Sequence, residues 1–136
     1  MLLVKTKLAV SNISGIGLFA DEFIPKGTYI WKFKKGFDMR FDKDYPNMLP
    51  EPAKSFFLTY ASQNPETLNY SLDADNARFF NHSSIPNTHG VNDSEDENAA
   101  CIASRNIQPG EELTCDYCKF DTNPFIGFDN SGQHLK

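Results

Sequence analysis

The sequence has few of the features that mark disulfide-rich, secreted or membrane proteins. Its three cysteines, Cys101, Cys115 and Cys118, are an odd number without framework spacing, so we expect free thiols in a reducing compartment. No long apolar run is present, and the mean hydropathy is −0.47, which argues against a membrane span. The apolar start, Met1–Lys5, is too short for a secretory signal. These absences predict a cytoplasmic protein with no membrane partner.

An excess of positive charge is also absent. The chain contains thirteen Lys and Arg and eighteen Asp and Glu, which gives a net charge of −5 at pH 7. A general nucleic-acid-binding protein carries a basic face, so this balance predicts no direct nucleic-acid partner and is compatible with a basic protein or peptide. The acidic run Asp93–Glu97 is interpreted as a solvated loop rather than a docking surface for a Lys-rich substrate.

The length of 136 residues suits one domain, and no linker divides the chain. We therefore expect a single domain over residues 1–136, with a core over 5–117 and a C-terminal tail over 118–136. Residues 50–63 carry two prolines and then apolar residues at helical offsets, which predicts a helix. The remaining pattern is of the strand type, with predicted strands at 5–10, 18–20, 29–33, 68–72, 99–105 and 113–117. The fold class is therefore mostly β with short helices.

A short pattern occurs twice at identical offsets. Its two copies are Ala20, Ile24, Gly27, Ile30 and Ala103, Ile107, Gly110, Leu113. Each copy is typical of a strand, a tight turn and a second strand, with glycine at the turn. An internal repeat and the chance agreement of two common turns both explain the pattern. Either origin favours several small sheets over one long sheet.

Three segments stand out as candidate site elements. Gly15–Ala20 is a Gly-x-Gly loop that runs into apolar residues, Arg78–Thr88 contains R-F-F-N-H-S-S-I-P-N, and Gly110–Tyr117 reads G-E-E-L-T-C-D-Y. Each segment is weakly specific alone, but their order and spacing are specific in combination. Together they resemble the SET-domain protein lysine methyltransferases.

The resemblance implies a SET-domain fold of several small curved sheets in which the C-terminal segment threads through an earlier loop as a pseudoknot. It also implies that S-adenosylmethionine binds on one face and that the target lysine enters a narrow channel from the opposite face. Methyl transfer is an in-line displacement, so the reacting atoms must be aligned about 3 Å apart. The amine must arrive neutral although a free lysine has a pKa of about 10.4, so a closed aromatic channel is expected to lower that pKa.

The resemblance assigns roles to particular residues. It implies that Tyr117 is the catalytic tyrosine, although an unassigned strand-end tyrosine is more often a packed core residue. Tyr60 is the candidate for a second catalytic tyrosine, with Tyr70 behind it. The residues implied to bind the cofactor are Ile16, Gly17, Leu18, Arg78, Phe79, Asn81, His82 and Tyr117. A phosphate-binding loop at Gly15–Gly17 is disfavoured, because no third glycine or Gly-Lys-Ser/Thr sequence follows.

The chain departs from some relatives in its tail. It lacks the zinc-binding cluster of three cysteines that some SET domains carry beyond the catalytic strand, and Cys115–Cys118 supplies only one C-x-x-C pair. Because structural zinc needs four ligands, no metal site is predicted. Tail residues Phe120, Phe125 and Phe128 either close the lysine channel or cap the core. Asp73 is expected to be structural.

The resemblance thus predicts an S-adenosylmethionine-dependent methyltransferase whose partner is a protein or peptide that carries a lysine. Two alternatives stay open. One is a catalytically silent SET-fold module that binds a peptide at a sheet edge, and the other is a methyltransferase for a non-protein amine.

Overall fold

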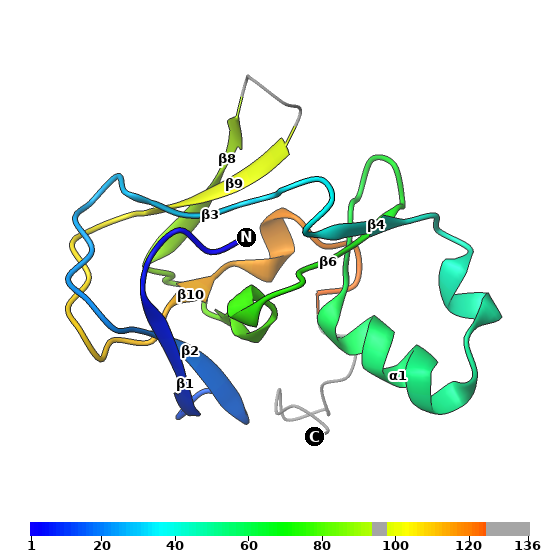
Figure 1. Cartoon of the computed structure of the whole chain (residues 1–136), viewed down its shortest axis with the longest axis horizontal. Helices are drawn as coiled ribbons and strands as arrows, with labels where there is room; N and C mark the ends of the chain where they lie inside the picture. The colour runs from blue at the N-terminus through cyan, green and yellow to red at the C-terminus, as the bar shows by residue number, and fades with distance from the viewer. Residues whose placement is uncertain (94–97, 125–136) are drawn as a thin grey trace.

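The described part of the chain consists of short strands with one α-helix at one end of the molecule (Figure 1). The computed structural model describes residues 1–93 and 98–124. The strands are β1 (Thr6–Val10), β2 (Ile16–Ala20), β3 (Tyr29–Lys32), β4 (Met39–Phe41), β5 (Ser62–Gln63), β6 (Tyr70–Leu72), β7 (Asn81–His82), β8 (Thr88–Asp93), β9 (Asn98–Ala103) and β10 (Thr114–Cys115). The helices are α1 (Glu51–Tyr60) and the 3₁₀ turns η1 (Tyr45–Met48), η2 (Asn76–Phe79) and η3 (Tyr117–Lys119). The predicted class, mostly β with short helices, is confirmed.

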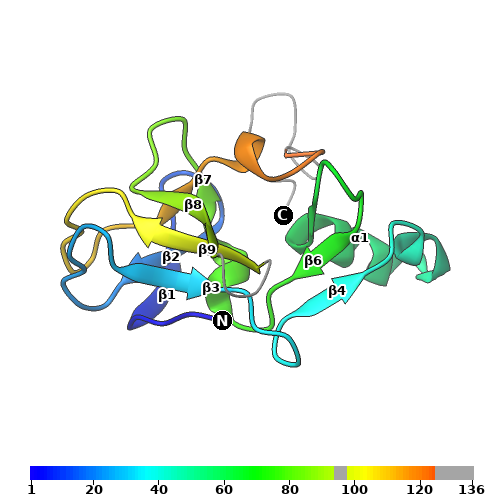
Figure 2. The same ribbon diagram turned by 90° about the horizontal axis from the view of Figure 1, so that it is seen from above.

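In residues 1–93 and 98–124 the strands form four small sheets, which agrees with the prediction of several small sheets. β1 pairs with β2, β3-β9-β8 and β4-β6-β5 form three-stranded sheets, and β10 pairs with β7. Seen from above, β4, β6 and α1 lie at one end of the molecule and β1, β2, β3, β8 and β9 at the other (Figure 2). The two ends meet at η2, which leads directly into β7.

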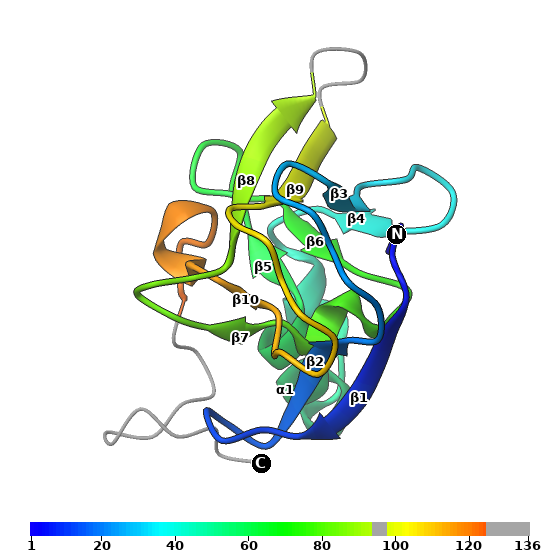
Figure 3. The same cartoon turned by 90° about the vertical axis from the view of Figure 1, so that its left-hand side faces the viewer.

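The parallel pair β7–β10 joins two of the motifs found in the sequence. Thr114 lies opposite Asn81 and Cys115 opposite His82, so the Asn-His segment and the segment that ends at Tyr117 are side by side (Figure 3). Threading of the C-terminal segment stays a prediction.

The repeated pattern has a structural counterpart. Ile24 and Ile107 each donate a backbone N–H to the other's carbonyl at 2.9 Å. Gly27 donates to Ala103 at 2.9 Å, and Gly110 donates to Ala20 at 2.8 Å, in the equivalent positions. Both glycines have positive φ, 83° and 88°, which a residue with a Cβ adopts only with strain. These matching bonds favour the interpretation as an internal repeat.

Two groups of apolar residues form the core. The first contains the apolar residues of both repeat copies together with Leu18, all at most 1% exposed. The second lies under α1, where Phe57, Ala61 and Leu72 pack with Phe41 and Tyr70. Within residues 1–93 and 98–124, no helix has the length and apolar character needed to cross a membrane.

Two predicted boundaries are wrong for local reasons. The helix ends at Tyr60 rather than residue 63, because Ser62 and Gln63 pair with β6 as the strand β5. The last strand ends at Cys115, because Asp116 caps η3 by accepting the N–H of Cys118 at 3.1 Å. Tyr117 therefore lies in a 3₁₀ turn and not at the end of a strand.

A buried ionic cluster ties the start of the chain to the turn between β3 and β4. The carboxylate of Asp38 is fully buried and pairs with the Met1 ammonium at 2.8 Å. It also accepts the backbone N–H groups of Lys34 at 2.8 Å and Ala74 at 3.3 Å. The nearby Asp73 is partly buried, and desolvation by burial followed by the charge of Asp38 raises its pKa to about 7.

We expect the variant Asp73→Asn to be more stable than the wild type at neutral pH. Because the folded pKa lies above the ordinary value of 3.8, the folded state holds a proton that the unfolded state releases, and stability falls as pH rises from about 4 to about 7. The amide does not ionise, so the variant should gain about 1–3 kcal/mol above pH 7 and nothing below pH 4. Urea unfolding at pH 4, 6 and 8 measures this, and a pH-independent difference would contradict the prediction.

Candidate functional site

A cavity of about 200 Å³ lies where the three sequence motifs meet, and it opens to solvent on one side. Its walls come from the tip of the β1–β2 hairpin, the end of α1, η2, β7 and the start of η3. The lining residues are Ser14, Gly15, Ile16, Thr59, Tyr60, Arg78, Phe79, Phe80, Asn81 and Tyr117.

The side chain of Asn81 has a fixed orientation in this wall. Its residue is 3% exposed, and its Nδ2 donates to the Ser14 carbonyl at 3.1 Å, the Ile16 carbonyl at 3.4 Å and Glu112 Oε1 at 2.7 Å. Three acceptors around the amide nitrogen determine which way the amide faces. Its oxygen accepts no hydrogen bond from the described residues, so it remains available to a donor in the cavity.

Glu112 organises the groups behind the cavity wall. Its carboxylate accepts from Asn81 and from the hydroxyl of Ser11, whose Oγ lies 2.8 and 2.9 Å from the two carboxylate oxygens. A Cβ placed on Gly17 would lie 2.2 Å from Glu112 Oε1. Glycine is needed at position 17 because the carboxylate occupies the space of a side chain.

Asn87 holds the two segments on either side of the site together. This residue is 5% exposed; its Oδ1 accepts the N–H of Thr114 at 2.9 Å and its Nδ2 donates to the Glu112 carbonyl at 2.8 Å. The Thr88 hydroxyl adds a bond to the Thr114 carbonyl at 2.8 Å. These side chains take the place of a regular strand ladder next to β10.

We expect Asn87→Ala to lower the free energy of unfolding by about 2–4 kcal/mol, because it leaves a buried backbone N–H and a carbonyl without partners. The matched control is Asn106→Ala, which removes the exposed acceptor of the Lys26 N–H in a surface turn and should cost at most about 1 kcal/mol. Urea unfolding of both variants measures the difference. Equal costs would show that the Asn87 bridge is not a special support of the site.

Tyr117 is tied to the Asn-His segment by three contacts. Its hydroxyl donates to the Phe80 carbonyl, and its backbone N–H donates to His82 Nδ1 at 3.2 Å. The ring centres of Tyr117 and His82 lie 5.4 Å apart, and the ring of Phe120 packs edge-on against that of Tyr117 at 6.0 Å. Burial, followed by the charges of nearby groups, raises the pKa of Tyr117 well above its ordinary value. The hydroxyl is therefore protonated and acts as a hydrogen-bond donor.

Another part of the cavity lining combines aromatic rings with one cation. The rings of Tyr60 and Phe79 meet edge-on at 5.5 Å. Arg78 is held at η2 by bonds from its Nε to the Asp75 carbonyl and from its NH2 to the Ala74 carbonyl, both at 3.2 Å. This part of the wall therefore offers flat apolar surface beside a positive charge.

The structure brings most of the predicted site residues to one place. The predicted residues that line the cavity are Ile16, Tyr60, Arg78, Phe79, Asn81 and Tyr117. His82 lies behind Tyr117. Gly17 packs against Glu112, and Leu18 is fully buried in the core with its carbonyl bonded to the Leu113 N–H, so neither residue lines the cavity.

Sequence reasoning missed several contributors to the wall, and it left one tyrosine undecided. Ser14, Thr59 and Phe80 line the cavity through positions next to predicted residues, so a closer reading of each motif's neighbours would have found them. Tyr70 packs at 5.3 Å from Phe57 in the second core cluster, which leaves Tyr60 as the second tyrosine of the cavity.

Two of the three cysteines, Cys101 and Cys115, have little of the character of reactive thiols. Burial raises the pKa of Cys101 and, more strongly, that of Cys115, which disfavours the thiolate form. Within the described part of the chain, no three His, Cys, Asp or Glu side chains are grouped as metal ligands. Of the tail rings, Phe120 contacts Tyr117, whereas Phe125 and Phe128 lie outside the described residues.

The comparison with protein families matches this chain to one description. A sequence model of the SET domain covers residues 15–118, which include every residue that lines the cavity except Ser14. The chain belongs to the SET-domain family. The SET domain found here is 29% identical over 116 residues to histone-lysine N-methyltransferase 2D of Homo sapiens and of Mus musculus. The match covers 84% of this chain but only 2% of the length of either relative.

Solved structures share the fold at low sequence identity. The SET domain superposes with a TM-score of 0.69 on a chain of apo ctPRC2 with mutations in Ezh2, with 21% identity, 89% of this chain covered and 16% of that chain. A candidate histone methyltransferase of Plasmodium falciparum gives a TM-score of 0.60 and 21% identity, with 85% of this chain and 95% of the other covered. These likenesses show that the small sheets form a SET-domain fold.

Proposed function

We propose that this SET domain is a methyltransferase that transfers a methyl group from S-adenosylmethionine to the side-chain amine of a lysine in a protein substrate. The observation that carries the proposal is the meeting of Asn81 and Tyr117, two residues from distant motifs, in the wall of one cavity. The names of the curated relatives, histone-lysine N-methyltransferases, support the choice of a lysine acceptor.

The lining residues fit the chemistry of this cofactor. Arg78 would face its carboxylate, the oxygen of Asn81 would accept from one of its N–H groups, and the rings of Tyr60 and Phe79 offer apolar surface to its base. The cavity is open on one side, so a ligand larger than about 200 Å³ can extend beyond it. When bound, the cofactor supplies an electrophilic methyl group on a positively charged sulfur.

The residues of the chain would supply orientation and exclusion of water. The Tyr117 hydroxyl donates its proton to the Phe80 carbonyl, so the phenol oxygen and the carbonyl oxygen together would accept the N–H groups of an amine and align it. The surrounding rings lower the local polarity, which favours the neutral form of a lysine that enters the site. No ionised base is required for this arrangement, and positioning would account for most of the catalysis.

Two measurements test the proposal. Isothermal titration calorimetry with S-adenosylmethionine should show one site per chain, and labelled-methyl transfer to a proteome lysate should mark lysines in discrete proteins. Absence of cofactor binding would favour the silent peptide-binding module. Binding of the cofactor with transfer only to small amines would favour the methyltransferase for a non-protein amine.

A further inference from the structure

The basic side chains of this acidic protein are concentrated in one segment. Residues 32–43 run from the last residue of β3 to two residues beyond β4 and contain five of the thirteen Lys and Arg but only two Asp and Glu. We call this segment the basic hairpin for its turn at Gly36, although β3 and β4 belong to different sheets. The five cations are Lys32, Lys34, Lys35, Arg40 and Lys43. The net charge of −5 is a sum over the whole chain and does not describe this locally positive segment. The expectation of no nucleic-acid partner was drawn from the net charge, so it does not apply to this segment.

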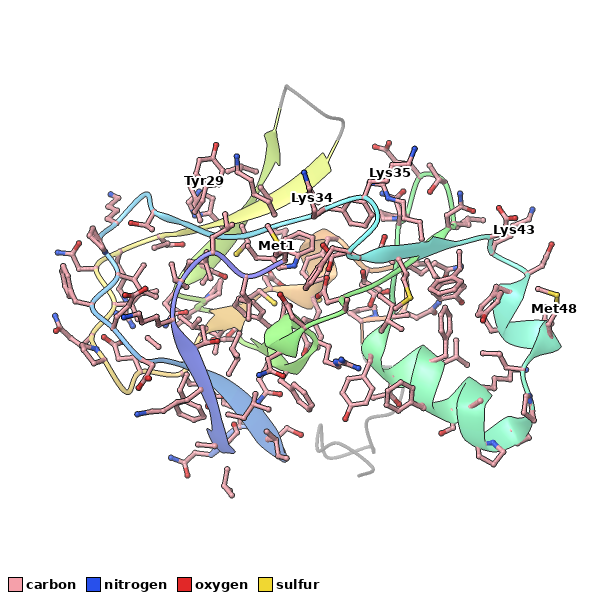
Figure 4. All side chains as sticks on the ribbon, viewed as in Figure 1. Met1, Tyr29, Lys34, Lys35, Lys43 and Met48 are labelled. Atoms are coloured by element: carbon pink, nitrogen blue, oxygen red, sulfur yellow. The ribbon has the colours of Figure 1, made fainter. Side chains whose placement is uncertain are left out.

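Three lysines of the basic hairpin have no ion-pair partner among the described residues. Asp38, one of the two acids, is buried and pairs with the Met1 ammonium. Lys34, Lys35 and Lys43 are exposed and form no ion pair with any residue in 1–93 or 98–124. Figure 4 shows these three lysines along one edge of the molecule.

The basic hairpin is held in a defined shape. The N–H groups of Phe37 and Asp38 both donate to the Lys34 carbonyl, at 3.0 and 2.8 Å, and Gly36 provides the positive φ of the turn. The Arg40 guanidinium lies 4.2 Å from the centre of the Phe33 ring. A preformed arrangement of cations costs less conformational entropy on binding than a flexible tail.

Two apolar side chains are exposed among the cations. The side chain of Phe37 is 44% exposed and that of Met39 is 42% exposed, so both are accessible to a partner. β4 is an edge strand of its sheet, whereas the N-terminal residues lie along the outer side of β3, where the Lys32 N–H donates to the Met1 carbonyl at 3.1 Å. Proteins that bind single-stranded nucleic acid combine cations, which contact the phosphates, with accessible aromatic rings, on which unpaired bases stack. An exposed ring between lysines is such a combination.

We propose that the basic hairpin binds single-stranded nucleic acid, with Lys34, Lys35 and Lys43 facing phosphates and Phe37 stacking on a base. Charge alone would also attract an acidic polypeptide or an anionic lipid surface, but neither offers flat faces to an exposed ring. A duplex offers the phosphates but keeps its bases paired. The proposal is independent of methyl transfer.

Fluorescence anisotropy with a labelled 12-nucleotide oligodeoxythymidine tests the proposal. Three neutralised phosphates predict a slope of about −2 for log affinity against log salt, so affinity should fall about 15-fold between 50 and 200 mM NaCl. The double variant Lys34→Gln/Lys35→Gln should bind more weakly and lower the steepness of the slope by about 1.4. Phe37→Ala should weaken binding at least about fivefold and leave the slope unchanged.

The matched control is Lys5→Gln/Lys26→Gln, which removes the same charge from exposed lysines outside the basic hairpin. This control should bind like the wild type, and circular dichroism and urea unfolding verify that every variant keeps its fold. Equal losses in the two double variants would overturn the proposal, because the effect would then be one of net charge. Undiminished binding by Phe37→Ala, or equal affinity for the duplex or for a polyglutamate peptide, would also overturn it.

Discussion

Replacing Tyr117 with phenylalanine (Tyr117→Phe) is expected to lower methyl transfer to lysine at least about tenfold while the affinity for S-adenosylmethionine stays within about twofold. The ring, which packs on His82 and Phe120, is retained, so the cavity wall keeps its shape. Only the hydroxyl that donates to the Phe80 carbonyl is lost. Rate and binding should therefore separate, and single-turnover transfer and calorimetry measure them independently.

The control for this variant is Tyr70→Phe, which removes a hydroxyl from the second core cluster and not from the cavity. It should leave transfer unchanged within about twofold. Unchanged transfer in Tyr117→Phe would remove this tyrosine from the catalytic site, whereas a parallel loss of cofactor affinity would assign it to binding.

The pH dependence of the rate gives a second reading of the same residue. Burial is the main cause that raises the pKa of Tyr117 above its ordinary value of 10, so the phenol stays protonated throughout the range in which the protein can be assayed. The pH–rate profiles of wild type and Tyr117→Phe should therefore be parallel from pH 7 to pH 10. A rise on the alkaline side that occurs only in the wild type would show that a phenolate acts as the base.

The variant Gly17→Ala is expected to lose about 2–4 kcal/mol of stability, a large effect for one methyl group. Its Cβ would lie 2.2 Å from Glu112 Oε1 and 3.1 Å from Ser11 Cβ. The carboxylate cannot move away without giving up its bonds to Ser11 and Asn81. Urea unfolding gives the stability, and the affinity for S-adenosylmethionine should fall as well, because Asn81 loses its fixed orientation.

A double-mutant cycle isolates the cause. In a Glu112→Ala background the opposing carboxylate is absent, so Gly17→Ala should cost at least about 1.5 kcal/mol less than it does in the wild type. The control Gly90→Ala places a methyl group on β8, where the nearest atom is 3.9 Å away, and should be close to neutral. Additive costs for Gly17→Ala and Glu112→Ala would contradict the proposed clash.

How far the site could be predicted depended on the range of its contacts. Asn81 and Tyr117 were found because each lies in a motif whose residues are adjacent in sequence. Tyr60 was found because helical offsets place it at the end of α1, which then packs against η2 through Phe79. In each case, local spacing carried the information.

Gly17 shows which contact the sequence did not reveal, and its role in cofactor binding stays a prediction. Its glycine suggested a backbone that approaches a ligand, but the structure fills the adjacent space with Glu112, which lies far along the chain. No local pattern encodes that contact, because it depends on how the β1–β2 hairpin docks onto the segment before β10. The basic hairpin was missed for a different reason, because its five cations lie close together in sequence but the net charge averages them with the rest of the chain.

The contact between Ser11 and Glu112 joins residues that are 101 positions apart in sequence. Tyr117 and Ser14, which line the same cavity, have a similar separation in sequence. A ribosome must therefore release nearly all of the described chain before any part of this wall can be completed. Closing such long loops is entropically costly and slow, so we expect ligand-binding competence to emerge only at the final stage of refolding.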